Sequence, residues 1–260
     1  MKKIRKSGFT LIEILAVIAL LSVLISIFVP AFNRMMFGSK VDQMASNFKT
    51  GMEVAQAKAV ASRKYVAMIL PGNYVDADPK LKPYCNGGFR LAFVKKEGDN
   101  WKFVSWVPGS SWTNIADGAM LVHLVSETDL KKNVHPDNCS CKTTAQACTI
   151  QDFYPREAGL NIRTNSSFAG ASFFLEEIED STSDPDMDAL GSSENRRAII
   201  FSPLGGSFNS TLPLYFFFTE AKIESTIYVY PNKDNFRTLK LNALTGRVTH
   251  QSAEVEYDEI

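Results

Sequence analysis

The sequence is poor in the residues and motifs that usually carry out catalysis. It contains three histidines, His123, His135 and His250, and none of them stands in a recognisable motif. Neither the G-x-S-x-G pattern of a nucleophile elbow nor the H-E-x-x-H pattern of a zinc hydrolase is present. We therefore do not expect an enzyme. A membrane-anchored enzyme with an unfamiliar site within 126–195 stays open as an alternative.

An excess of charge of either sign is also absent. Lysine and arginine together number 28, as do aspartate and glutamate, so the formal net charge is zero. Proteins that bind nucleic acid through its phosphates present a basic surface. The chain after Arg247 is instead acidic, with Glu254, Glu256, Asp258 and Glu259. We therefore do not expect a nucleic-acid partner.

Cysteine is scarce, with four residues, Cys85, Cys139, Cys141 and Cys148. In an oxidising compartment they would form disulfides. Cys139 and Cys141 are too close to pair comfortably with each other, so we expect bonds to Cys148 or across to Cys85, and the pairing stays open. His135 and the three later cysteines could form a zinc site, but their spacing does not match a standard pair of C-x-x-C knuckles. We expect neither a metal nor another cofactor.

One long hydrophobic run dominates the N-terminal part of the chain. Residues 9–29 are almost entirely apolar, and Glu13 is the only charge among them. At about 1.5 Å per residue, a helix of this length spans roughly 30 Å, the thickness of a bilayer core. We therefore expect a transmembrane helix over 9–29. Four basic residues precede it and would stay in the cytoplasm: Lys2, Lys3, Arg5 and Lys6. The chain after the helix would then face outward.

Three kinds of N-terminal segment combine a basic stretch with such a run: a cleaved secretory signal, an uncleaved anchor, and a leader clipped ahead of the run. A secretory signal has an apolar stretch of only roughly 7 to 15 residues, followed by a small-residue cleavage site. An uncleaved anchor gives no reason for Glu13, because a carboxylate in a bilayer costs a few kcal/mol. A charge at this depth calls for a partner, unless Glu13 merely reaches the headgroups.

Ser7-Gly8 followed by Phe9-Thr10-Leu11-Ile12-Glu13 resembles the prepilin peptidase signature of type IV pilins and pseudopilins. The resemblance implies that 1–8 is a leader, that cleavage falls between Gly8 and Phe9, that the new Phe9 amine is methylated, and that Pro30 kinks the helix. It implies three partners: the peptidase, an inner-membrane assembly platform, and other pilins or pseudopilins in a filament. The Phe9 amine of one subunit could then neutralise Glu13 of its neighbour.

Beyond Pro30, apolar residues recur at three- and four-residue steps, which predicts an amphipathic continuation of the helix over 30–63. They are Val41, Met44, Phe48, Met52, Ala55 and Ala59. A helix with such a stripe must bury it, so we expect it to pack on a sheet.

Strand patterns follow the helix, and we expect the first four to form an antiparallel meander, with a hairpin turn over 97–100. The first four cover 65–70, 89–96, 101–107 and 120–125. Further strands are expected over 198–202, 214–219, 225–230 and 237–241. A last short strand follows the turn at 245–247. The expected fold class is α+β, a pilin-like long N-terminal helix packed on antiparallel β-sheets. The globular part spans 64–260.

Residues 126–195 predict a loop-rich insertion in the globular part, with at most short strands such as 171–175. Asp184, Asp186 and Asp188 alternate as in a calcium loop. However, the glycine is displaced, and Asn195 stands where a bidentate glutamate would be needed, so we favour an acidic, solvated loop.

Aromatic residues are concentrated in the second and third predicted strands and just after them. We expect them to fill the core, with Trp112 the most exposed; they are Phe89, Trp101, Phe103, Trp106 and Trp112.

The globular part resembles, more weakly, the H-type minor pseudopilin, in the segments 57–63, 198–205 and 241–248. The resemblance implies a minor pseudopilin of a type II secretion or type IV pilus-like filament that supports protein secretion. Such a subunit would cross the bacterial inner membrane once, with its N-terminus in the cytoplasm and its globular domain in the periplasm, before extraction into a periplasmic filament. The alternative is a minor pilin that binds DNA or a surface ligand, which the acidic residues after Arg247 disfavour.

Overall fold

The computed structural model describes residues 11–71, 77–114, 118–126, 175–191, 193–209, 212–224 and 227–251. The molecule divides into two compact units, residues 1–39 and residues 40–260. The first helix, α1 (Leu11–Ser62), contributes its first half to one unit and its second half to the other.

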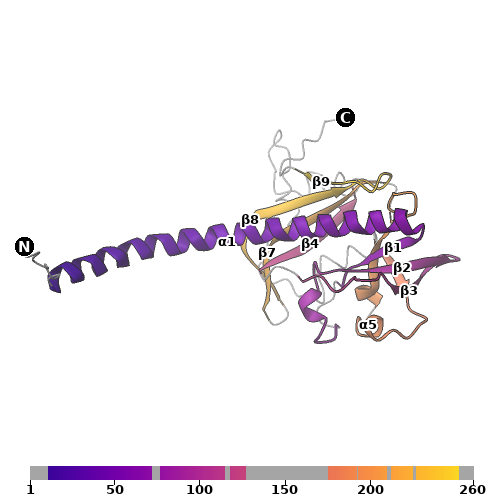
Figure 1. Cartoon of the computed structure of the whole chain (residues 1–260), viewed down its shortest axis with the longest axis horizontal. Helices are drawn as coiled ribbons and strands as arrows, with labels where there is room; N and C mark the ends of the chain where they lie inside the picture. Colours follow the sequence, from indigo (N-terminus) through magenta and orange to yellow (C-terminus); the bar gives the residue numbers. More distant parts are fainter. Residues whose placement is uncertain are drawn as a thin grey trace, which may run out of the picture. The chain divides into compact units, whose positions relative to one another are not determined.

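The helix α1 is continuous over 52 residues and ends where the sequence predicts (Figure 1). The next residue, Arg63, adopts a left-handed conformation with φ of 53°, and its backbone N–H donates to the Val60 carbonyl. A left-handed residue is the usual way to end a helix, although glycine usually occupies that position.

Five strands close into a barrel in the order β1-β2-β3-β5-β6. They are β1 (Tyr65–Ile69), β2 (Arg90–Glu97), β3 (Asn100–Trp106), β5 (Glu176–Glu179) and β6 (Arg197–Phe201). The β2–β3 hairpin turns at Gly98, with φ of 62°, as predicted. The pairs are antiparallel except β3 with β5, where Trp101 lies opposite Ile178 in a parallel register.

The remaining strands form a separate antiparallel sheet in the order β4-β7-β8-β9. They are β4 (Ala119–Ser126), β7 (Leu214–Glu224), β8 (Ile227–Leu241) and β9 (Val248–Gln251). The prediction that β4 extends a meander from β3 is wrong, because β4 pairs with β7, about a hundred residues later in the chain. The prediction of two separate strands over 225–230 and 237–241 is also wrong, because one long strand, β8, covers 227–230 and 237–241 without a break, while 225 and 226 lie outside the described residues.

The described end of the predicted insertion contributes to the barrel rather than to a loop alone. Residues 171–174 of the predicted strand lie outside the described residues, and the strand that is present, β5, closes the barrel between β3 and β6. The described residues also include three short helical turns: η1 (Lys82–Tyr84), α5 (Pro185–Asp188) and η3 (Ser193–Arg196).

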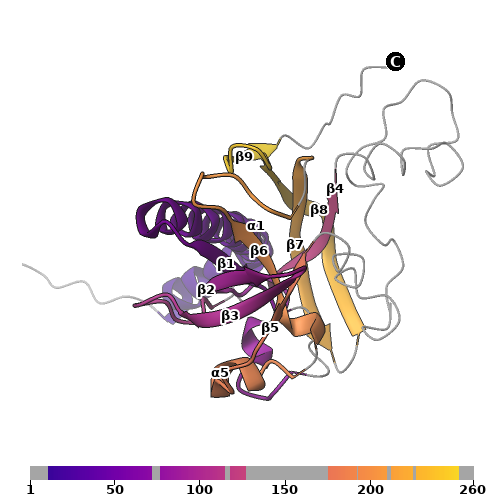
Figure 2. The ribbon, with the colours of Figure 1, turned by 90° about the vertical axis from the view of Figure 1, so that its right-hand side faces the viewer.

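Residues 40–62 of α1 pack into a core shared by the barrel and the sheet, which form the two β-layers in Figure 2. Every predicted stripe residue of this half is buried, and each belongs to this core. Phe48 lies near its centre, with ring centroids 5.9 Å from Phe89, 5.3 Å from Phe216 and 5.1 Å from Phe218. A second core fills the barrel around Trp101, Ile69 and Ile200. The fold is therefore α+β, with the helix packed on β-sheets as predicted.

Candidate functional site

Residues 11–26 and 28 of α1 present apolar side chains on all sides of the helix. Leu11 is 80% exposed, and the exposed apolar side chains include neighbours such as Leu20 with Leu21 and Val23 with Leu24. Successive residues of a helix point about 100° apart, so side chains at consecutive positions cover every face. A helix that is apolar all round needs an apolar environment, such as a membrane or a bundle of similar helices.

Polar groups in this half are few, and the hydroxyls of Ser22 and Ser26 are satisfied within the helix. Ser22 Oγ donates to the Ile18 carbonyl at 2.8 Å, and Ser26 Oγ donates to the Val23 carbonyl at 2.7 Å. Neither hydroxyl therefore needs water or a neighbour for its hydrogen bond. Glu13 lies in the first turn of the described part of α1.

The predicted processing site lies outside the described residues, because Gly8 and Phe9 both precede the first of them. Among the described residues, no helix meets the length and hydropathy of a membrane crossing. The predicted span over 9–29 includes Phe9, which is not described, and it stays a prediction. The backbone of α1 is helical through Pro30, whose side chain is not described, so the kink also stays a prediction.

The second half of α1 is held on the globular part by polar contacts as well as by its buried stripe. The Asp42 carboxylate pairs with the Arg237 guanidinium of β8, and Arg237 Nη2 lies 3.2 Å from Asp42 Oδ2. Near the other end, Gln56 Nε2 donates to the Gly205 and Thr245 carbonyls, each at 2.7 Å. Gln56 thereby joins three segments that are distant in sequence.

The two turns that Gln56 joins also contact each other closely. Ser207 N donates to the Ala243 carbonyl at 2.7 Å. Gly246 has φ of 66°, and a Cβ added to it would lie 2.1 Å from the Gly205 oxygen. A glycine is therefore required at 246 by both its conformation and the space around it.

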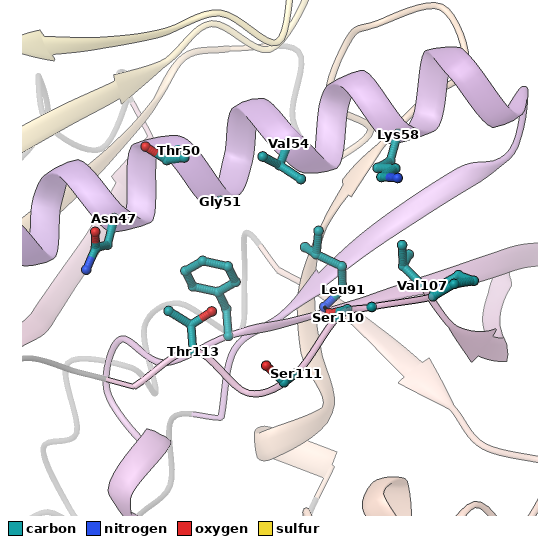
Figure 3. A pocket seen from close by; sticks show the side chains of 13 residues that line it. Asn47, Thr50, Gly51, Val54, Lys58, Leu91, Val107, Ser110, Ser111 and Thr113 are labelled. Carbon is teal, nitrogen blue, oxygen red and sulfur yellow. Dashed lines mark hydrogen bonds between the residues drawn. The ribbon is translucent and has the colours of Figure 1, made fainter.

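A groove of about 440 Å³ runs between α1 and the loop that follows β3 (Figure 3). Phe89, Leu91 and Val107 line it with apolar surface, while Thr50, Ser110 and Thr113 contribute hydroxyls. Among the described residues that line it, Lys58 carries the only charge. These residues offer apolar contact and hydrogen bonds to a ligand.

Cys85 is a buried free thiol among the described residues, and because its possible partners lie outside them, a disulfide to Cys85 stays a prediction. Burial raises the pKa of its thiol to about 12, although Lys82 nearby opposes the shift. The other cysteines, Cys139, Cys141 and Cys148, lie outside the described residues together with His135. A disulfide among the three therefore stays a prediction.

Two of the alternating aspartates, Asp184 and Asp186, make contacts that hold the α5 turn. Asp184 Oδ1 accepts from the backbone N–H groups of Asp186 and Met187, which caps α5, and from Trp106 Nε1 at 3.1 Å. The Asp186 carboxylate pairs with Arg90, whose guanidinium lies 4.0 Å from the centre of the Trp106 ring. Among the described residues, no group of three or more His, Cys, Asp or Glu side chains could hold a metal ion. These carboxylates therefore attach the α5 turn to the barrel.

The aromatic residues fill the barrel and its border, as predicted for most of them. Phe89, Trp101 and Phe103 are buried. Trp112 is only half-buried, and its ring lies 5.8 Å from both Tyr84 and Trp106. Trp112 therefore covers the border of the barrel core. Trp106 is half-buried too, so the expectation that Trp112 is the most exposed residue of the set stays a prediction.

Comparison with protein families gives one match, over residues 3–29, to the family described as the prokaryotic N-terminal methylation motif. The match includes Gly8, Phe9 and Glu13 and extends to the last residue of the predicted membrane helix. Comparisons with curated proteins and with solved structures give no match.

Proposed function

We propose, from the premise that the chain carries the N-terminal methylation motif of the type IV pilin and pseudopilin family, that it is a minor pseudopilin of a secretion filament. Proteins of this family are structural subunits rather than enzymes, are processed by prepilin peptidase, and are anchored in the membrane before assembly. In our proposal the chain enters a type II secretion or type IV pilus-like filament and supports protein secretion.

The observation that carries the proposal is the combination of the motif with the surface of α1. The match over 3–29 coincides with a helix half whose apolar side chains are exposed on all sides. Such a surface is suited to a bilayer before assembly and to a bundle of like helices after it. Cleavage after Gly8 would leave the Phe9 amine four residues from Glu13, so that the amine of one subunit and the carboxylate of the next can pair.

A carboxylate is costly in an apolar environment, and pairing with the amine of a neighbour would lower that cost. A lone charge in an apolar environment is strongly unfavourable, whereas an oppositely charged partner within hydrogen-bond distance offsets much of the cost. Each new subunit would bring one amine and one carboxylate, so the contact repeats along a filament. The repeat is head-to-tail and does not close into a ring.

The assignment to the H-type minor subunit is supported by where its three marker segments lie. Gln56, one residue before the segment 57–63, donates hydrogen bonds to Gly205 in the second segment and to Thr245 in the third. The three segments that carry the resemblance, although distant in the sequence, are therefore neighbours in the fold. We place the globular domain in the periplasm, because the basic residues of the leader favour a cytoplasmic N-terminus.

The proposal is tested by changing Glu13 and measuring incorporation into filaments. We expect Glu13→Gln to be cleaved after Gly8 like the wild type but to enter filaments at least tenfold less often, because the amine of the neighbour loses its partner. Glu13→Asp keeps the charge and serves as the matched control, with an intermediate result expected. Normal incorporation of Glu13→Gln would contradict the assembly role of this carboxylate.

A further inference from the structure

An exposed apolar patch lies beside the end of α1. Leu204 is 96% exposed, Leu244 is 80% exposed and Val60 of α1 is 49% exposed. Their segments are in contact, because a Cβ added to Gly205 would lie 3.8 Å from Val60 Cγ2, and one added to Gly206 would lie 2.7 Å from the Leu244 oxygen. Single exposed leucines are common, but a group of them indicates an interaction site. We call Val60, Leu204 and Leu244 the two-leucine patch.

The turns that carry the two leucines are held in place before any partner arrives. Gln56 donates to the carbonyls of Gly205 and Thr245, each next to one of the leucines. Ser202 N–H⋯O=C Gly206, at 2.8 Å, closes the first turn, and Gly246 N–H⋯O=C Asn242, also at 2.8 Å, closes the second. A surface that is already ordered loses less entropy on binding.

Two exposed arginines lie close in sequence to patch residues. Arg63 follows α1 one turn after Val60, and Arg247 follows Leu244 in the same turn. In the described part of the chain, neither guanidinium has an ion-pair partner. A partner for this surface should therefore carry carboxylates beside apolar side chains.

We propose that the two-leucine patch, with Arg63 and Arg247, binds residues 252–260 of a second copy of this chain. That stretch places carboxylates beside apolar side chains, which matches the patch in both respects: Glu254, Val255, Glu256, Tyr257, Asp258, Glu259 and Ile260. The inference rests on the proposed filament function, for which it identifies a contact between globular domains.

The direction of β9 favours a second copy over the same chain. Val248 follows Arg247 directly, and the strand then runs for three more residues to Gln251. At about 3.3 Å per residue, this carries the chain roughly 10 Å away from Arg247 before residue 252 begins. The same chain could reach its own patch only by turning back over this distance, at a cost in backbone entropy, whereas the tail of a neighbour needs no such turn. A contact between unlike surfaces of two copies continues along a filament.

The test uses a fluorescent synthetic peptide of residues 252–260 and the full chain in detergent, ended after Gln251 so that no segment of its own competes. We expect saturable binding by fluorescence anisotropy. Leu204→Ser with Leu244→Ser should weaken it at least tenfold, and Arg63→Gln with Arg247→Gln should weaken it and reduce its salt dependence. The matched control is Val104→Ser, which removes another exposed apolar side chain, on β3, and should bind like the wild type. Tryptophan fluorescence confirms that each variant is folded.

Two results would overturn the inference. One is no saturable binding, and the other is binding that neither the two leucine substitutions nor the two arginine substitutions change. A third would overturn the choice of a second copy. In that case the chain ended after Gln251 binds the peptide, but the full chain neither binds the peptide nor self-associates in sedimentation. This result would mean that residues 252–260 occupy the patch of their own chain. The same samples are analysed by intact mass after co-expression with a prepilin peptidase. A chain that is cleaved after Gly8 but does not bind the peptide refutes this contact alone, and an uncleaved chain refutes the proposed function.

Discussion

Replacing Gln56 by alanine should loosen the junction between α1 and the two turns that it joins. Gln56 Nε2 donates to the Gly205 and Thr245 carbonyls at 2.7 Å, and the Gly205 contact is partly buried while the Thr245 contact is exposed. A hydrogen bond of this kind contributes about 0.5 to 1.5 kcal/mol to stability. Water can replace the amide at Thr245 more easily than at Gly205. Alanine also has a slightly higher helix propensity than glutamine, which offsets a few tenths of a kcal/mol of the stability lost with the hydrogen bonds.

The free energy of unfolding should therefore fall by about 1 to 2 kcal/mol in Gln56→Ala. For a domain of this size that corresponds to a decrease in Tm of roughly 2 to 8 °C. The assay is urea unfolding of the full chain in a non-ionic detergent, followed by tryptophan fluorescence, since the three tryptophans all lie in or just after β3. Gln43→Ala is the matched control, because Gln43 is exposed on the same helix, and its stability should be unchanged. Equal stabilities for Gln56→Ala and Gln43→Ala would refute the reasoning.

Three further predictions concern the core, the thiol and a surface carboxylate. Phe48→Ala should lower the free energy of unfolding by about 3 to 5 kcal/mol, because it removes a buried ring that contacts three others, and the same urea titration measures it. Cys85 should resist alkylation at pH 8 in the folded chain and react in urea, because burial raises the pKa of its thiol to about 12; rapid labelling of the native protein, read by mass spectrometry, would contradict this. Glu97 should titrate with a pKa of about 2, because Lys102 and Lys95 donate hydrogen bonds to its carboxylate. The contribution of the Glu97 carboxylate to stability should be present above about pH 4.5 and disappear as the pH falls toward about 2. Glu97→Gln should therefore lose less stability than the wild type between these two pH values. A Glu97 pKa near 4.5 by NMR would contradict the assignment.

The helix and most strands could be predicted because their signals are local. The apolar steps from Val41 to Ala59 identify the buried face of α1, and the alternation in 101–107 identifies β3. Each pattern reflects the geometry of its own element, with a period of 3.6 residues in a helix and two in a strand. The motif around Gly8 and Glu13 is similarly local, and the family match covers it.

Strand partners could not be predicted from such signals. Nothing in 119–126 indicates that β4 pairs with β7 instead of β3, and nothing in 176–179 indicates that β5 lies parallel to β3 and closes the barrel. Pairings of this kind depend on which apolar faces the whole chain can bury together, a property of the folded molecule.

The contacts of individual polar side chains were missed for a related reason. Gln56 looks like an ordinary polar helix residue in the sequence, and its two acceptors are 149 and 189 residues away. The capping role of Asp184 did have a local signal, since an aspartate directly before a proline and two residues before another acidic residue is typical of a helix start. The calcium-loop comparison drew attention to the spacing of the carboxylates instead of to Pro185.

The central claim is that the chain is a prepilin-like subunit that is cleaved after Gly8 before it assembles. Intact-mass spectrometry of the full chain co-expressed with a prepilin peptidase, beside Gly8→Ala as a control, tests it most directly. We expect the wild type to lose residues 1–8 and gain one methyl group on Phe9, and Gly8→Ala to keep its leader. A wild-type chain that retains residues 1–8 in the presence of active peptidase would contradict the claim.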